Sequence, residues 1–178
     1  MLLNAASGAS TIFYPKVIDM AFNPDSPTIR NIEAAFAGEA MANRKYLYFA
    51  RRARELGAID VAEVFERTAE QETAHAFGHL ELLYPKADLT VETMLQLAID
   101  GETHEYTEMY PKFRHLAEQE GHQAAVAEID EQIAESREHA EQFAKVLEKA
   151  AKRFAALTKV EERHANHYRD VLAAHRND

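Results

Sequence analysis

The chain has 178 residues, of which 28% are charged, and a formal net charge of −10 at pH 7. That length suffices for one domain with a hydrophobic core, and the small numbers of glycines (six) and prolines (five) favour long helices. The acidic balance argues against a nucleic-acid partner, because no basic stripe is present to offset phosphates. The sequence has no cysteine, which excludes disulfides, cysteine-ligated zinc and iron–sulfur clusters within these residues.

Residues 1–27 contain three prolines and no hydrophobic periodicity, and they predict an N-terminal leader segment. No basic start is followed by a sustained apolar run, so we expect no signal peptide. No stretch approaches the roughly 20 apolar residues that a membrane span requires. We therefore expect a cytoplasmic protein without a membrane partner, whose residues 28–178 form one helical domain.

Start and end signals predict helices over approximately 28–57, 60–83, 90–121 and 123–175. Pro27-Thr28 supplies a cap for the first helix, Tyr84-Pro85 closes the second, and Thr90 can cap the third. Residues 123–175 contain neither glycine nor proline. This last stretch is either one very long helix or two helices that meet without a break in the sequence.

Each predicted helix carries an apolar stripe at helical spacing, and ionisable residues occupy the middle of every stripe. The stripes are Ile32, Phe36, Glu39, Asn43 and Tyr46; Val61, Phe65, Thr68, Glu72, His75, His79 and Leu82; Leu95, Ala98, Glu102, Glu105 and Met109; and Phe154, Leu157, Glu161, His164, Tyr168 and Val171. A buried carboxylate without a partner costs much free energy, so several of them in one core require a compensating charge. Metal cations supply such a charge.

An internal repeat supports a paired arrangement of the helices. Gly38-Glu39 is followed by Gly57, and Gly101-Glu102 is followed by Gly121. Two helix pairs related by a pseudo-two-fold axis would bring the glutamates of the stripes together. Gly38 and Gly101 would allow close approach of neighbouring helices beside them, at a cost of roughly 1 kcal/mol each relative to alanine.

The ionisable residues follow the ligand pattern of di-iron helical bundles. That pattern takes one glutamate from each of two helices and Glu-x-x-His from each of the other two. The single glutamates here are Glu39 and Glu102, and the pairs are Glu72-x-x-His75 and Glu161-x-x-His164. Residues three apart share a helical face, so both members of a pair can reach one cluster. The mixture of carboxylates and imidazole suits iron or manganese better than magnesium or structural zinc.

At these residues the chain resembles the rubrerythrin family. The matching segments are Ala35–Glu39 with Tyr46, Thr68–Ala76, Gly101–Pro111 and Val160–Tyr168. The resemblance implies an all-α fold, a ferritin-like four-helix bundle with an additional or extended C-terminal helix. The longer rubrerythrins of cyanobacteria are similar to this chain in the region before the last motif.

The resemblance also implies the roles of individual residues. The iron ligands it implies are Glu39, Glu72, His75, Glu102, Glu161 and His164. Glu105 is the extra carboxylate that marks rubrerythrins, and one iron shifts between it and His75 as the redox state changes. Tyr46 and Tyr110 match tyrosines that hydrogen-bond to ligating carboxylates. Glu105, Tyr46 and Tyr110 are therefore the candidate catalytic residues.

The activity implied is a peroxidase that reduces hydrogen peroxide to water in defence against oxidative stress. Its cofactor is a pair of iron ions, oxo-bridged when oxidised. The rubredoxin domain of many family members needs four cysteines, so electrons are expected from a separate donor protein such as a rubredoxin or a reductase. Family members pair as dimers, which predicts a homodimer. The alternatives are dioxygen activation or ferroxidase chemistry, and a non-enzymatic iron-binding helical module.

Two segments compete to complete the site. Compared with short family members, about 25 residues (approximately 122–148) are inserted before the last motif, and they include Glu135, Glu138 and His139. Ser136, not a glutamate, stands three residues before His139. Glu161 and His164 have the required spacing and lie on the stripe, so they are the predicted ligands. The two histidines would be about 37 Å apart in an unbroken helix, so either the helix breaks between about 148 and 152, or subunits exchange C-terminal helices.

Overall fold

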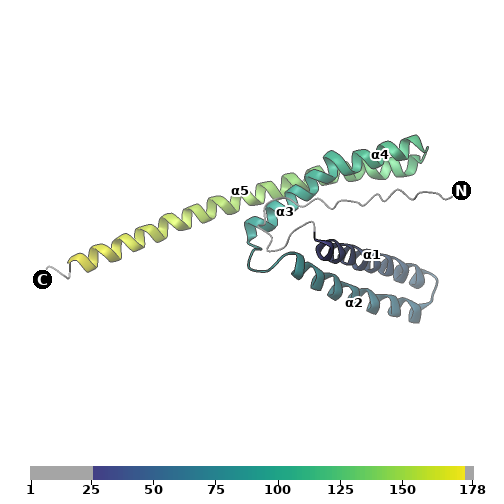
Figure 1. Ribbon diagram of the computed structural model, residues 1–178, viewed down its shortest axis with the longest axis horizontal. Helices are drawn as coiled ribbons and strands as arrows, with labels where there is room; N and C mark the ends of the chain where they lie inside the picture. Colours follow the sequence, from purple (N-terminus) through teal and green to yellow (C-terminus); the bar gives the residue numbers. More distant parts are fainter. Residues whose placement is uncertain (1–25, 175–178) are drawn as a thin grey trace. The chain divides into compact units, whose positions relative to one another are not determined.

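The computed structural model describes residues 26–174, so the predicted leader segment lies outside the described residues except at its end. Within the described range every element is a helix (Figure 1), which confirms the predicted all-α class. The chain divides into two units, residues 1–89 and residues 90–178. No helix in residues 26–174 is long and apolar enough to cross a membrane.

Unit 1 is a hairpin of two helices, α1 (Pro27–Glu55) and α2 (Ile59–Leu83). The N-terminal cap is Ser26 rather than the predicted Pro27-Thr28: the Ser26 hydroxyl accepts a hydrogen bond from the backbone N–H of Thr28 at 3.2 Å. Gly57 ends the first helix with φ at +78°, a left-handed conformation that costs glycine little. This turn sends the chain directly into α2.

Small side chains make the contact between the two helices of unit 1. Ala50 and Ala53 of α1 and Ala62 of α2 form a buried cluster, and Phe65 packs against it. Along α2 the buried residues recur every seventh position: Ala62, Ala69, Ala76 and Leu83. A seven-residue period of this kind keeps one face of a helix against its neighbour.

Unit 2 starts with three helical elements in direct succession: α3 (Val91–His104), the π-helix η1 (Glu105–Met109) and α4 (Tyr110–Gln119). Thr90 caps α3 as predicted, because its hydroxyl accepts from the Thr93 backbone N–H at 3.0 Å. The sequence predicted one helix here and did not predict the π segment. After Gly121, again at φ +78°, α5 (Gln123–Ala174) packs along all three elements.

The π-helix accounts for the spacing of the internal repeat. Before it, corresponding residues are 63 positions apart, as in Gly38 and Gly101 or Glu39 and Glu102. After it they are 64 positions apart: Tyr46 and Tyr110, Gly57 and Gly121, Ala62 and Val126, His75 and His139. A π turn inside an α-helix accommodates an extra residue. The two units are therefore the same hairpin motif with one residue inserted in the first arm of unit 2.

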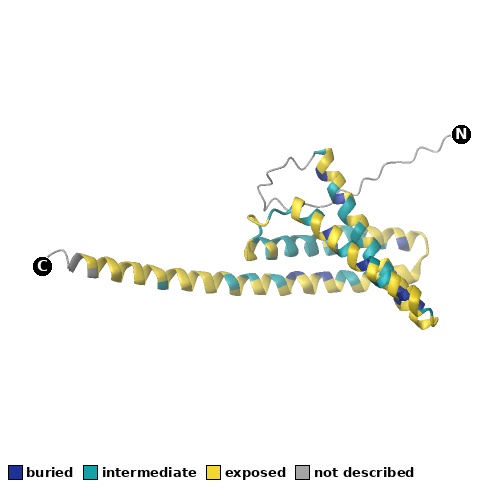
Figure 2. Ribbon diagram, turned by 90° about the horizontal axis from the view of Figure 1, so that it is seen from below, coloured by how far each residue is buried: buried dark blue, intermediate teal, exposed yellow. Residues whose placement is uncertain are grey.

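Helix α5 is continuous, so of the two alternatives that the sequence left open, a break between about residues 148 and 152 is wrong. Figure 2 shows that its C-terminal half is almost entirely exposed. Phe154, Leu157 and Tyr168 are at least half exposed, although their stripe was predicted to be buried. Phe154 and Leu157 line an open hollow together with Val91 of α3, and beyond them no second element covers the described part of the helix.

The other predicted stripes are half-buried rather than fully buried. In α1 and α3 their members all have intermediate exposure, and in α2 Val61 and Leu82 are 44% and 55% exposed. The reason is that a hairpin covers only the face where two helices touch, which small alanines occupy. The faces that carry the glutamates and histidines lie beside this contact.

Candidate metal centre

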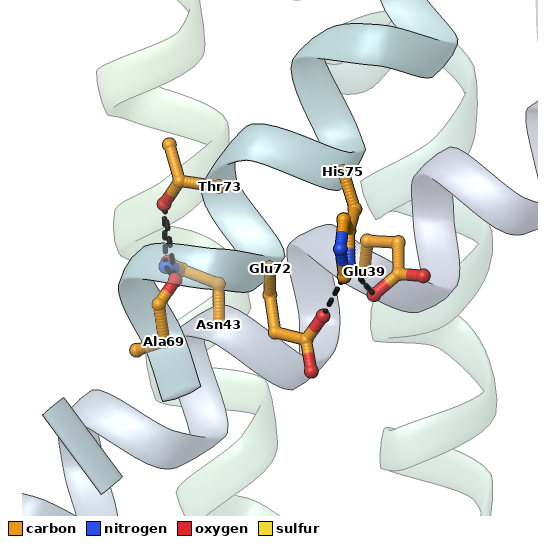
Figure 3. Close-up of polar contacts among 6 residues, drawn as sticks. All are labelled: Glu39, Asn43, Ala69, Glu72, Thr73 and His75. Carbon is orange, nitrogen blue, oxygen red and sulfur yellow. Dashed lines mark hydrogen bonds and ion pairs between the residues drawn. The ribbon is translucent and has the colours of Figure 1, made fainter. Parts of the chain in front are cut away.

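Unit 1 gathers three ionisable side chains at the middle of its hairpin. Glu39 comes from α1, and Glu72 and His75 come from α2 (Figure 3). The Nδ1 atom of His75 lies 3.0 Å from Glu72 Oε2 and 4.0 Å from Glu39 Oε2. The Glu72 side chain is 17% exposed, the Glu39 side chain 30% and the His75 side chain 60%. One donor atom from each residue lies within 4.8 Å of the other two, which is close enough for a single cation.

The two carboxyl groups of this cluster shift each other's pKa in opposite directions. A hydrogen bond to Glu72 raises the pKa of Glu39 above the usual carboxyl range, and burial and repulsion by Glu72 act in the same direction. The pKa of Glu72 is lowered, because Glu72 accepts hydrogen bonds from Glu39 and from His75. Like charges at this distance resist full ionisation unless a cation joins them. The donor set therefore fits a divalent metal, whose positive charge would offset the two carboxylates.

Asn43 holds the two helices in register beside the cluster. Its Nδ2 atom donates to the Ala69 carbonyl at 2.7 Å and to the Thr73 hydroxyl at 2.9 Å (Figure 3). Asn43 follows Glu39 by one helical turn, and Thr73 follows Glu72 directly. Asn43 is a member of the apolar stripe predicted for the first helix, and the sequence predicted no function for it. Its position in the middle of an apolar stripe was the signal that it has a polar partner on the facing helix.

Unit 2 brings together a corresponding set from α3, η1 and α5. Glu102 Oε1 lies 3.5 Å from Nδ1 of His139, and their side chains are 23% and 49% exposed. Glu105 accepts a hydrogen bond from the Ser136 hydroxyl at 3.0 Å. Burial raises the pKa of Tyr110, and the negative charges of Glu105 and Glu102 raise it further. The phenol of Tyr110 is thus within electrostatic reach of both carboxylates.

Tyr46, the other predicted catalytic tyrosine, lies in unit 1. Its ring packs against Phe65, with the centroids 5.9 Å apart. The repeat relates the two tyrosines. Tyr46 follows Glu39 by about two helical turns, and Tyr110 follows Glu102 by about two. The hydrogen bond to a ligating carboxylate that the sequence predicts for each of them stays a prediction.

The C-terminal pair lies apart from both clusters. Glu161 and His164 are 3.9 Å from each other, with side chains 77% and 62% exposed. Because α5 is unbroken, His164 is about 37 Å along the helix from His139. The structure therefore brings Glu102 to His139 and not to His164. The assignment of Glu161 and His164 as ligands now requires helix exchange between two chains. It stays a prediction in that form, and the geometry of unit 2 favours the competing candidate, His139.

The sequence offered His139 as the competing candidate, but it did not predict the contact of His139 with Glu102 or that of Ser136 with Glu105. The signal was present in the repeat, because His139 follows His75 by the same 64 positions that separate Gly57 from Gly121. Recognising it required knowing that the offset changes from 63 to 64 within the third predicted helix, and the π-helix that causes this change is visible only in the structure.

Comparison with known proteins agrees with this arrangement. The family model described as Rubrerythrin matches residues 30–147, which include the segment predicted to be inserted and end before Glu161. A rubrerythrin of Nitratidesulfovibrio vulgaris is 37% identical over 131 residues, which cover 66% of this chain and 68% of that protein. A rubrerythrin of Porphyromonas gingivalis is 36% identical over 135 residues, covering 68% and 66%. Nigerythrin of N. vulgaris is 32% identical over 128 residues, covering 65% and 63%.

The helical hairpins, the clusters of glutamate and histidine, and the match over residues 30–147 lead to one assignment. The fold of this family is a ferritin-like helical bundle, and its members are di-iron carboxylate proteins. The chain belongs to the rubrerythrin family.

Proposed function

We propose that the protein is a di-iron peroxidase that reduces hydrogen peroxide to water as a defence against oxidative stress. Its ligands are Glu39, Glu72, His75, Glu102 and Glu105, with His139 as the second imidazole. The observation that supports this proposal best is the cluster of unit 1, where two carboxylates and a histidine each place a donor atom within 4.8 Å of the other two. The repeated set in unit 2 offers a matching glutamate and histidine.

The overall reaction consumes one peroxide, two electrons and two protons and yields two water molecules. The iron pair would supply two electrons and stabilise charge on both oxygen atoms. The protein's own contribution is to hold carboxylates whose charge matches that of the metal. The hydrogen bond to Glu72 raises the pKa of Glu39, so Glu39 keeps a proton to higher pH than an ordinary carboxyl group does. Tyr110 and Glu105 are further groups from which a proton can be transferred.

The electrons are proposed to come from a separate donor protein, such as a rubredoxin or a reductase. These 178 residues contain no cysteine, so they offer no ligands for a rubredoxin-type iron. The donor must approach an acidic surface, since the net charge is −10. A donor with a complementary basic patch would therefore associate faster at low ionic strength.

Dioxygen activation or ferroxidase chemistry is the rival function, because other ferritin-like proteins use the same type of site. The extra carboxylate Glu105 favours peroxide. It lies one turn after Glu102, at the start of the π segment, where the second arm of unit 2 fixes one of its oxygens. A non-enzymatic iron-binding role is the remaining alternative.

The test begins with anaerobic loading of the purified protein with Fe²⁺ and measurement of the iron content. The reduced protein is then mixed with peroxide or with air-saturated buffer in a stopped-flow spectrometer. We expect about two irons per chain and much faster oxidation by peroxide than by dioxygen. Equal rates would support the oxidase or ferroxidase function, and a protein that takes up no iron would contradict both.

A further inference from the structure

Ser136 stands at the place in unit 2 that Glu72 occupies in unit 1. The two residues are 64 positions apart, the same offset that relates His75 to His139 and Ala76 to Ala140. In both units the residue lies one turn before the histidine, on the same helix face. The packing agrees, because Ala76 and Ala140 are both buried at 5% and 7% exposure. Unit 2 thus has a hydroxyl where unit 1 has a carboxylate.

The Ser136 side chain is buried and has one partner among the site residues. The residue is 5% exposed, and its Oγ donates to Glu105 Oε2 at 3.0 Å. Within residues 26–174, Ser136 and Glu33 are the two polar or charged residues that are buried. A buried hydroxyl is retained at low cost only when it is hydrogen-bonded. Helix α5 therefore supports a carboxylate that belongs to η1, the other arm of the hairpin.

The π-helix explains why Glu105 needs this support. Its extra residue begins at Glu105, so the carboxylate leaves the regular helical path that Glu102 follows. A long side chain at such a point has several rotamers, and fixing it costs conformational entropy. The hydrogen bond from a buried and rigid serine selects one position and leaves the second oxygen, Oε1, for another partner.

We propose that Ser136 is a positioning residue for Glu105. Its hydroxyl lies where the histidine-bearing helix of unit 1 has the carboxylate of Glu72, and it holds a carboxylate of the opposite helix. Unit 1 then holds Glu39, Glu72 and His75, and unit 2 holds Glu102, Glu105 and His139. This inference rests on the proposed function, because the purpose of holding Glu105 is metal binding.

The test compares Ser136→Ala and Ser136→Thr with the full-length wild type. Crystal structures of the metal-free proteins give the conformation of Glu105. Titration with Co²⁺, followed by its visible absorption bands, gives affinity and ligand geometry without any assay of activity. Thr68→Ala is the matched control, because it removes a hydroxyl that bonds only to its own helix at Val64.

We expect Ser136→Ala to release Glu105 into more than one conformation, to weaken Co²⁺ binding about tenfold and to shift the absorption bands. Ser136→Thr should restore all three properties, and Thr68→Ala should change none. If Glu105 and the Co²⁺ spectrum are unchanged in Ser136→Ala, the proposal is wrong even when iron still binds. If the wild type binds neither Co²⁺ nor Fe²⁺, the proposed function fails, and the crystal structures alone decide whether Ser136 positions Glu105.

Discussion

Units 1 and 2 share one hairpin design and differ in the helix that supplies the second carboxylate. Both turn at a left-handed glycine, and both tie their arms with an arginine fork, Arg54 on Glu66 and Arg114 on Asp130. Unit 1 takes one carboxylate from each arm. Unit 2 takes both from the first arm, where a π-helix makes room for the extra one.

The difference shows how a repeated motif acquires two unlike halves without losing its fold. The turn, the fork and the small buried residues determine the hairpin, and they are the same in kind in both units. The residues near the metal centre are free to differ, because they lie beside the helix contact rather than in it. One inserted residue and one serine distinguish unit 2, where a hydroxyl of the second helix holds a carboxylate of the first.

The largest effect is expected from Glu72→Ala. This change removes the carboxylate that the second helix of unit 1, α2, places in the cluster. The variant should bind about one iron or fewer per chain instead of two, measured by elemental analysis after anaerobic loading. The metal-free variant should melt no lower than the wild type, because Glu72 raises the pKa of Glu39 through hydrogen bonding and repulsion. Glu70→Ala, an exposed glutamate on the same helix, is the control. Full iron content in Glu72→Ala would refute the assignment.

The second prediction tests which histidine completes the set of unit 2. His139 lies 3.5 Å from Glu102, whereas His164 lies about seven turns further along α5. We expect His139→Ala to weaken Fe²⁺ binding by at least tenfold, and His164→Ala and Glu161→Ala to leave it unchanged. The reverse result, together with a dimer in solution, would establish the exchange of C-terminal helices that the sequence predicts.

The third prediction concerns Glu105, the carboxylate at the start of the π-helix of unit 2. Glu105→Ala should retain much of the iron but slow oxidation by peroxide by roughly tenfold or more, as followed by stopped-flow absorption. Oxidation by dioxygen should change less. Glu108→Ala is a suitable control, since this exposed residue of the same segment pairs with Lys112. Similar slowing with both oxidants would favour an oxidase function.

The smallest effect is a pH dependence that belongs to unit 1. Glu72 raises the pKa of Glu39, so a proton competes with metal for Glu39 up to higher pH than at an ordinary carboxyl group. Affinity for Co²⁺ should therefore rise with pH through this raised pKa, with proton release detectable by calorimetry in two buffers. Glu72→Gln removes the neighbouring charge, so the pKa of Glu39 falls and the midpoint moves to lower pH. An unshifted midpoint would show that the two carboxyl groups are not coupled.

The sequence predicted the four helical stretches well, because glycine, proline and capping residues mark their ends. Thr90, Gly57 and Gly121 act as expected. The π-helix was not predicted, since no local signal separates one extra residue from a continuous helix. The partners of Glu102 and Glu105 were missed for the same reason, because the inserted residue changes the register between the arms. The ligand roles of Glu39, Glu72 and His75 stay predictions. The proximity of Glu72 and His75 could be expected from helical spacing, and that of Glu39 from the pairing of the first two helices.

The last part of α5 is less stabilised by tertiary packing than the rest of the helix. Residues 158–170 are exposed apart from half-buried Val160, so their helical hydrogen bonds receive no support from tertiary packing. Lysine, glutamate and alanine favour a helix there, but a short helix without a packed face is only marginally stable in water. Amide hydrogens beyond residue 158 should therefore exchange with solvent much faster than those of residues 123–147. In a single chain the end of α5 is a helix that frays, and it becomes rigid only where another surface covers it.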